Sequence, residues 1–292
     1  MKHEELDAHR RTVSLPAGEI AYADIGDGPP VLFVHGVFLH AALWRNVIEA
    51  IGVGRRCIAV DLPAHGHTKV RPDQSLSVAA QAEMLVGLCD ALGLDQFDLV
   101  GNDTGGAVCQ VLAATHPQRV RSLALTNCDC HTNLPPERFR PATDLAKAGE
   151  LAPTLEKLAA DPSLARSDFG VGVGFEHPDQ LSDDDLRSYA LCVATPDAAR
   201  ECERFVASLD AADLLAIEPA LQSFDRPTLI VWGTGDVFFE ISWAHWLRDN
   251  IPGAGEVVEL DGAKLFFPDE RGPELAGHLQ RFWSTVEAGA TA

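Results

Sequence analysis

The chain reads VGNDTGGA from Val100 to Ala107. Apolar residues precede this stretch and a helical pattern follows it, which is typical of a turn from a strand into a helix. Glycine two positions before and two positions after Asp103 relieves crowding where a strained turn lifts one side chain above a sheet. The N–H groups that open the next helix point at the same place and suit an anion or a developing oxyanion. The pattern predicts an elbow with Asp103 at its tip; the glycines alone leave open a tight turn without chemistry.

Strands and helices alternate on both sides of this elbow. Short apolar runs that alternate with helical patterns indicate an α/β fold with a mostly parallel sheet and helices on both faces. The sequence predicts an eight-stranded sheet whose first two strands form a hairpin. The strands are predicted at residues 12–15, 19–25, 31–35, 57–61, 97–101, 122–126, 228–232 and 256–260, and helices at 41–51, 78–92, 106–115, 242–250 and 274–287.

The alternation is interrupted once, between residues 126 and 228. This interval holds helical segments with apolar faces and no convincing strand, so we expect a helical cap inserted after the sixth strand. Such a cap would cover the carboxyl ends of the strands, where open α/β sheets bind ligands. The predicted boundaries place the core in residues 1–130 and 222–292 and the cap in residues 131–221. A long surface linker is the alternative, and the apolar helix faces speak against it.

Composition limits the classes of partner and compartment. The 43 acidic and 23 basic side chains give a formal net charge of −20, which repels phosphate backbones and anionic membranes. We therefore expect no nucleic acid and no membrane among the partners, and no run of 18 apolar residues that could span a bilayer. The odd number of cysteines, seven, and a charged N-terminus without an apolar segment predict a cytoplasmic protein.

No known cofactor motif stands out in the sequence. We find no H-E-x-x-H, no C-x-x-C pair and no phosphate-binding loop, so neither a metal nor an organic cofactor is expected. The expected partner is a small-molecule substrate, and the oligomeric state, homodimer included, stays open.

Two more loops follow predicted strands and accompany the elbow. The chain reads HGVFLHAALW from residue 35 and DLPAHGHT from residue 61. In the first loop, a backbone N–H near Val37 and Phe38 can complete an oxyanion hole. Together with GNDTGG at 101–106, these motifs resemble, in order and separation, the α/β-hydrolase superfamily and its aspartate-nucleophile branch of haloalkane dehalogenases and epoxide hydrolases. The resemblance covers nearly the whole chain and is weakest in the predicted cap.

The resemblance implies a mechanism and assigns residues to it. In that branch an aspartate attacks a carbon electrophile and forms an alkyl-enzyme ester. A histidine then activates water to hydrolyse the ester, and a second acid orients the histidine. Asp103 matches the nucleophile, and the backbone N–H groups of Val37 and Thr104 match the oxyanion positions. Asp236, which follows the seventh predicted strand, matches the orienting acid; a turn-forming aspartate is the alternative there.

The chain departs from the family pattern where the histidine is expected. Residues 260–271 read LDGAKLFFPDER, and no histidine is among them. One alignment places the expected position near Phe266 and another at Lys264. Without a base, an alkyl-aspartate ester would form and stay, because water is a poor nucleophile toward an ester.

Three residues are candidates for replacing the base. His40, in the oxyanion loop, and His131, at the entrance to the predicted cap, are the histidines that best fit by position, whereas His65 is expected to be structural. Lys264 could act only if burial lowered its pKa by several units. The competing interpretation of Lys264 is an ion pair with the carboxylates of Asp103 and Asp236.

Two more departures concern specificity. Haloalkane dehalogenases usually stabilise the leaving halide with side-chain N–H donors at positions that here hold Thr104 and Val37, and valine has no such donor. Epoxide hydrolases usually offer two cap tyrosines, and this chain has only Tyr189 in the predicted cap. Three hypotheses stay open: a hydrolase acting on a small apolar haloalkane, epoxide or ester through Asp103; a lyase, cyclase or cofactor-free oxygenase; and a ligand-binding protein without turnover.

Overall fold

One nine-stranded sheet organises the computed structural model, which describes residues 1–290. The strand order is β1-β2-β4-β3-β6-β7-β8-β9, with β5 beside β2. The strands are β1 (Arg10–Leu15), β2 (Gly18–Ile25), β3 (Pro30–Val34), β4 (Arg56–Val60), β5 (Lys69–Val70), β6 (Phe97–Asp103), β7 (Val120–Cys128), β8 (Thr228–Gly233) and β9 (Val258–Leu260). All eight predicted strands are present, and the two-residue β5 is the addition.

The direction of the strands follows from how they are connected. β1 and β2 form an antiparallel hairpin, and β2 pairs antiparallel with β4. From β4 to β9 every neighbouring pair in the order is parallel, because a helix or a longer crossover returns the chain to the same end of the sheet. β6 lies in the middle with all seven residues buried, as expected for a parallel strand covered on both faces. The predicted α/β architecture is confirmed.

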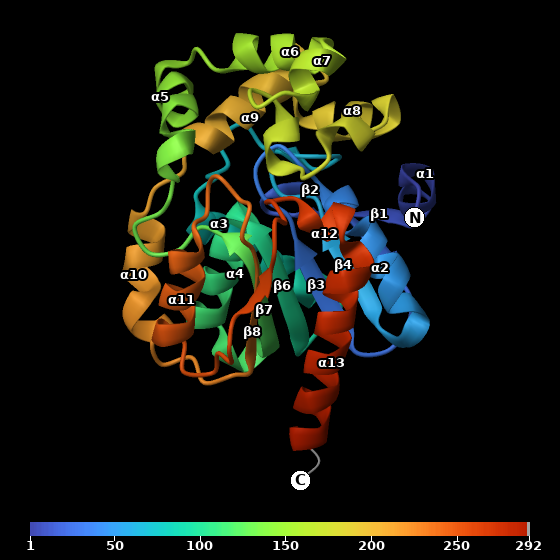
Figure 1. Cartoon of the computed structure of the whole chain (residues 1–292), viewed down its shortest axis with the longest axis vertical. Coiled ribbons are helices and arrows are strands. Elements are labelled where there is room, and N and C mark those ends of the chain that lie inside the picture. Colours follow the sequence, from blue (N-terminus) through green and yellow to red (C-terminus); the bar gives the residue numbers. More distant parts are fainter. Residues whose placement is uncertain (291–292) are drawn as a thin grey trace.

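Helices cover both faces of this sheet. Figure 1 shows α4 and α10 on one side and α2 and α13 on the other. α4 packs on β6 and β7, and α2 and α13 pack against each other. The helices of these layers are α2 (Arg45–Ile51), α3 (Val78–Ala91), α4 (Thr104–Thr115), α10 (Ala212–Leu221), α11 (Ile241–Asn250) and α13 (Gly272–Ala290). None of the described helices combines the length and the apolar content needed to cross a bilayer.

The segment between β7 and β8 forms a separate group of helices over the carboxyl ends of the strands (Figure 1). Its α9 buries Ala199, Cys202, Phe205 and Val206, which share one face at helical spacing. α10 differs, because it packs on α4 and lies below this group, although the predicted cap included it. The group contains α5 (Arg140–Ala148), α6 (Ala152–Ala160), α7 (Pro162–Arg166), α8 (Asp183–Tyr189) and α9 (Pro196–Ala207).

Short elements complete the chain. α1 (His3–Asp7) lies near the N-terminus, and α12 (Phe267–Glu270) directly precedes α13. The 3₁₀ turns are η1 (Ala41–Trp44), η2 (Gly52–Gly54), η3 (Pro117–Arg119), η4 (Glu137–Phe139), η5 (Val171–Gly174), η6 (Pro178–Gln180) and η7 (Ala190–Val193). The loop between β3 and η1 approaches the elbow at the end of β6. β3 and β6 are neighbours in the sheet, so together they position the site.

Candidate active site

Asp103 ends β6 in a strained backbone conformation. Its φ of 56° and ψ of −136° lie in a region that residues with a Cβ rarely adopt. The chain can turn so sharply because Gly105 approaches the backbone of β3: a Cβ there would lie 2.2 Å from the carbonyl oxygen of His35. The turn places the Asp103 carboxylate at the N-terminal end of α4, as the sequence pattern predicts.

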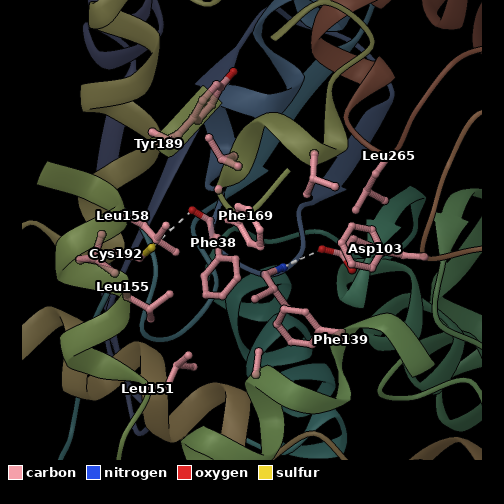
Figure 2. Close-up of a pocket in the computed structure, with 18 of the residues that line it drawn as sticks. Phe38, Asp103, Phe139, Leu151, Leu155, Leu158, Phe169, Tyr189, Cys192 and Leu265 are labelled. Atoms are coloured by element: carbon pink, nitrogen blue, oxygen red, sulfur yellow. Dashed lines mark hydrogen bonds between the residues drawn. The ribbon is translucent and has the colours of Figure 1, made fainter. Parts of the chain in front are cut away.

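Backbone N–H groups hold the Asp103 carboxylate. The Val37 N–H donates to Oδ2 at 2.9 Å, and the Thr104 N–H also hydrogen-bonds the carboxylate. Figure 2 shows the carboxylate at the wall of a cavity with the first of these bonds drawn. Gly36 allows this approach, since a Cβ on it would lie 2.3 Å from both Cβ and Oδ2 of Asp103. The two expected oxyanion donors are thus brought together at the Asp103 carboxylate.

A cavity of about 710 Å³ lies between the elbow and the inserted helices. Its wall is mainly apolar and comes from the oxyanion loop, the loop before α12 and the helices of the insertion. Two exposed charged residues, Arg138 and Asp168, also line it. Its apolar residues include Phe38, Phe139, Leu155, Leu158, Leu265 and Phe266. Such a wall suits an apolar guest molecule, with Asp103 and Thr104 as the polar groups beside the elbow.

Burial changes the acidity of the two expected catalytic acids. It raises the pKa of Asp103 to about 7, against the opposing effect of the Val37 and Thr104 hydrogen bonds, and the charge of Asp236 adds to the rise. Burial also raises the pKa of Asp236 to about 6. The Asp236 carboxylate accepts hydrogen bonds from Asn127 Nδ2 and the Phe238 N–H, both at 2.8 Å. Asn127 therefore already donates to Asp236 Oδ2, an oxygen that could otherwise accept a hydrogen bond from a histidine and orient its ring.

Leu265 belongs to the loop in which the family pattern places the histidine. Together with Phe266, its side chain lines the same cavity as Asp103 (Figure 2). Asn102 Nδ2 fixes this loop by donating to the Leu265 carbonyl at 3.0 Å. Of the two positions to which the missing histidine was aligned, Phe266 lines the cavity and Lys264 does not. No histidine lines the cavity within residues 1–290.

Lys264 is half-buried but lies outside the cavity wall. Its ammonium group is not among the charges that act on Asp103 or Asp236. The expected ion pair with these two carboxylates is therefore absent from the described structure, and the side chain is placed neither as a base nor as a counter-ion.

His40 and His131 also lie away from Asp103, contrary to the expectation that one of them could replace the base. His40 Nε2 lies 3.0 Å from both the carbonyl and the hydroxyl oxygen of Ser188, and its Nδ1 accepts from the Ala42 N–H. His131 hydrogen-bonds Glu218 through Nδ1 at 2.9 Å, and its ring stacks on Trp246. Packing thus turns both rings toward structural partners.

His65 holds the oxyanion loop in place through a hydrogen bond to its backbone. The Phe38 N–H donates to His65 Nε2 at 3.1 Å, and His65 Nδ1 bonds the Pro63 carbonyl at 3.0 Å. Burial lowers the pKa of His65 to about 4, so the ring is neutral at pH 7 and can accept this bond. The structural role expected for His65 agrees with these contacts.

Asp129 is a buried acid beside the elbow that the sequence analysis did not single out. The Thr104 hydroxyl lies 2.9 Å from Asp129 Oδ2, and Asp129 is fully buried. Burial raises the pKa of this carboxyl well above its usual range, and the charges of Asp103 and Asp236 raise it further. The available signal was an acidic residue directly after β7, at the same sheet edge as Asp103.

Tyr189 lines the cavity, and Figure 2 shows its hydroxyl pointing away from Asp103. That hydroxyl donates to Asp269 and lies 3.4 Å from Arg45 Nη1. Since the group is already bonded in a buried cluster, it is poorly placed to donate a proton near Asp103.

A strained strand-to-helix elbow, two backbone donors and a cavity under an inserted helical group define a hydrolase of the α/β type. Residues 29–270 match the family model described as alpha/beta hydrolase fold, and the chain belongs to this family. The chain is therefore an enzyme of the α/β-hydrolase fold, and its relatives include the haloalkane dehalogenases.

Individual relatives match nearly the whole chain. The haloalkane dehalogenase 2 of Mycobacterium tuberculosis (strain ATCC 25618 / H37Rv) is 29% identical over 284 residues, which cover 91% of this chain and 92% of that protein. The monoacylglycerol lipase abhd6-A of Xenopus laevis is 26% identical over 273 residues, 90% of this chain and 77% of the relative. A crystal structure of a DBJA mutant has a TM-score of 0.81 at 21% identity and covers 96% of this chain and 99% of its own, which shows the shared fold.

Proposed function

We propose that this chain is a hydrolase that opens a small apolar electrophile through nucleophilic attack by Asp103. The observation that supports it most is the way the Asp103 carboxylate is held. Its Oδ2 accepts from the Val37 N–H at 2.9 Å, while the side chain faces an apolar cavity of about 710 Å³. An oxygen fixed in this way keeps the second oxygen aimed at a guest molecule.

The same contacts select the kind of electrophile. In the attack, an Asp103 oxygen forms a bond to a saturated carbon, and the bond from that carbon to its leaving group breaks, with the electron pair going to the leaving group. The backbone donors then hold the carbonyl oxygen of the new ester. A carboxylic-ester substrate would need those donors for its own carbonyl, and Asp103 already occupies them. Alkyl halides and epoxides fit this arrangement better than esters do.

Breakdown of the ester, not its formation, limits turnover in this proposal. Hydrolysis of an alkyl-aspartate ester requires a base that activates water. Leu265 and Phe266 line the cavity in the loop where the histidine was expected, and no histidine lines the cavity within the 290 residues described. The alkyl-enzyme should therefore accumulate after a single fast step.

The test is alkylation of the purified protein with 1-bromohexane at pH 8, followed by intact-protein mass spectrometry. We expect one hexyl group per chain, located on the peptide that contains Asp103, and one equivalent of bromide released as a burst. Asp103→Asn is the control that should prevent both, since an amide is a poor nucleophile. Modification elsewhere, or none in wild type, would contradict the proposal.

A second function follows from the acidity of Asp103. Because burial raises its pKa to about 7, the carboxyl can both give and accept a proton near neutral pH. With Leu265 in place of a base, proton transfer in a lyase or isomerase reaction is the alternative to covalent attack. Exchange of acidic C–H protons of bound apolar ketones, followed by NMR in deuterated buffer without any mass adduct, would favour it.

A further inference from the structure

Thr104 connects the nucleophile to a second buried acid. The Thr104 N–H bonds the Asp103 carboxylate, and its hydroxyl lies 2.9 Å from Asp129 Oδ2. Thr104 also lines the cavity, whereas Asp129 lies behind it and is fully buried. One residue therefore reaches the nucleophile, the cavity and an acid without solvent contact.

The surroundings of Asp129 favour its neutral form. The charged groups that act on it are the carboxylates of Asp103, at the end of β6, and Asp236, after β8, and the thiols of Cys128 and Cys130 flank it. From α4, Gln110 donates to its backbone carbonyl at 2.7 Å, not to its carboxyl group. No basic side chain is among the groups that shift its acidity. These surroundings favour the protonated form of the Asp129 carboxyl, against the opposing effect of the Thr104 hydrogen bond.

The proton of Asp129 belongs on the oxygen that faces Thr104. Among the described residues, Oδ1 is buried without a hydrogen-bond partner, while Oδ2 has the Thr104 hydroxyl. A proton on Oδ2 is therefore satisfied by donation to Thr104 Oγ1, whereas a proton on Oδ1 would be an unpaired buried donor. With Asp129 as the donor, the Thr104 hydroxyl hydrogen is free to be donated to another acceptor.

We propose that Thr104, backed by Asp129, is the acid that protonates an oxygen leaving group when Asp103 attacks carbon. This inference rests on the proposed function, because it concerns the same attack. The role of Thr104 restricts the substrate class to electrophiles whose carbon–oxygen bond breaks, as in a strained cyclic ether. A departing halide needs no proton.

The step balances in protons and charge. Asp103 forms a carbon–oxygen bond, the carbon–oxygen bond of the strained ring breaks, and its oxygen takes the proton of the Thr104 hydroxyl. Thr104 takes the proton of Asp129 at the same time. The pair starts with Asp103 charged and Asp129 neutral, and it ends with a neutral ester and a charged Asp129. Because alkylation removes the Asp103 charge that opposes ionisation of Asp129, attack itself promotes the donation.

Other polar groups of the cavity are less suited to this role. The Tyr189 hydroxyl is bonded to Asp269, and the Cys192 thiol donates to the Phe38 carbonyl at 3.4 Å. Val37, the other residue beside the carboxylate, offers a backbone N–H that is already used by Asp103. Thr104 is adjacent to the nucleophile and has a proton source behind it.

The experiment compares two probes of equal chain length, 1,2-epoxyhexane and 1-bromohexane, on the full-length protein at pH 8. The readout is the rate of Asp103 modification by mass spectrometry, expressed as the epoxide-to-bromide ratio, so that the bromide reports folding and the nucleophilicity of Asp103. Asp129→Asn and Thr104→Val should each lower the ratio at least tenfold, since general acids commonly contribute between about 10² and 10⁴. Thr104→Ser keeps the hydroxyl and should restore most of the ratio.

The outcomes separate this inference from the proposed function. Modification by bromide with a ratio that neither variant changes would overturn the role of Thr104 and Asp129 and leave Asp103 as nucleophile. Modification by neither probe would contradict the proposed function itself. A ratio that falls in Thr104→Val and recovers in Thr104→Ser, while Asp129→Asn behaves as wild type, would remove Asp129 from the step.

Discussion

Leu265 lines the same cavity as Asp103 with an apolar side chain, in the loop where the family pattern places the histidine base. The loop that holds it is fixed by Asn102, which donates to the Leu265 carbonyl at 3.0 Å. Since the backbone is fixed, a longer polar side chain at this position would still be directed toward the ester. The absence of hydrolysis in this proposal therefore depends on one side chain and not on the architecture of the site.

Leu265→His should shorten the lifetime of the alkyl-Asp103 ester at least tenfold, because a positioned histidine can activate water. The measurement is the decay of the hexyl adduct after removal of excess 1-bromohexane, followed by mass spectrometry in 18-oxygen water, which also labels the regenerated carboxylate. Leu265→Asn is the control, since it is polar but not basic and should leave the ester long-lived. If the ester decayed faster than in wild type and equally fast in both variants, polarity alone would govern the step.

The acidity of Asp103 makes stability depend on pH. Burial raises its pKa from 3.8 to about 7 in the folded chain. Between about pH 4 and 7 the unfolded chain has released a proton that the folded chain keeps, so the free energy of unfolding falls as the pH rises through this window. Above pH 7 the free energy of unfolding no longer falls on account of Asp103. The total loss is then roughly 4 kcal/mol, at about 1.36 kcal/mol for each pKa unit.

Asp103→Asn removes this penalty. Its free energy of unfolding should exceed that of wild type by a margin that grows from pH 4 to 7 and is constant above pH 7. Urea unfolding at pH 5, 7 and 8.5 measures the margin. Asp73→Asn, at an exposed aspartate, should differ from wild type by much less at each pH. A margin that stays flat across the three pH values would mean that burial does not govern the acidity of Asp103.

At the scale of elements, the site depends on how closely the loop after β3 approaches the end of β6. A Cβ on Gly36 would lie 2.3 Å from Asp103 Oδ2, so Gly36→Ala should destabilise the fold by roughly 1–3 kcal/mol and displace the carboxylate from the Val37 N–H. Urea unfolding and hexyl labelling measure the two effects. Gly255→Ala is the matched control, because a Cβ there meets nothing within 4 Å. Equal stability and labelling in the two variants would contradict the close approach.

The elements that could be predicted from sequence are those fixed by local pattern. The order of strands and helices follows from apolar runs and turns, and the elbow at Asp103 follows from its flanking glycines. His40 was expected to be a candidate base from its place in the oxyanion loop, but the direction of its ring depends on Ser188 and Ala42, which only the packed structure brings together. Asp129 was missed for the same reason, since its importance comes from a contact with Thr104.

At the scale of the whole molecule, a buried polar cluster joins the inserted helices to the core. Arg45, on α2, lies 2.9 Å from Asp185 on α8 and 3.1 Å from Asp269 on α12. The Tyr189 hydroxyl, from α8, donates to the same Asp269. His40 adds a link to Ser188 at 3.0 Å. These contacts fix α8, and with it the Tyr189 ring, against one side of the cavity.

Tyr189→Phe tests whether this tyrosine is structural or acts as an acid. Loss of the hydroxyl removes one buried hydrogen bond to Asp269, which keeps its contact with Arg45, so the free energy of unfolding should fall by about 1–3 kcal/mol, and amide exchange in α8 should speed up. The epoxide-to-bromide labelling ratio should stay within about twofold of wild type, because the hydroxyl points away from Asp103 and Thr104 supplies the proton. A ratio at least tenfold lower with unchanged exchange in α8 would instead assign the acid to Tyr189. The cluster would then have to open during the reaction, since in the closed molecule Asp269 and Arg45 hold that hydroxyl away from the elbow.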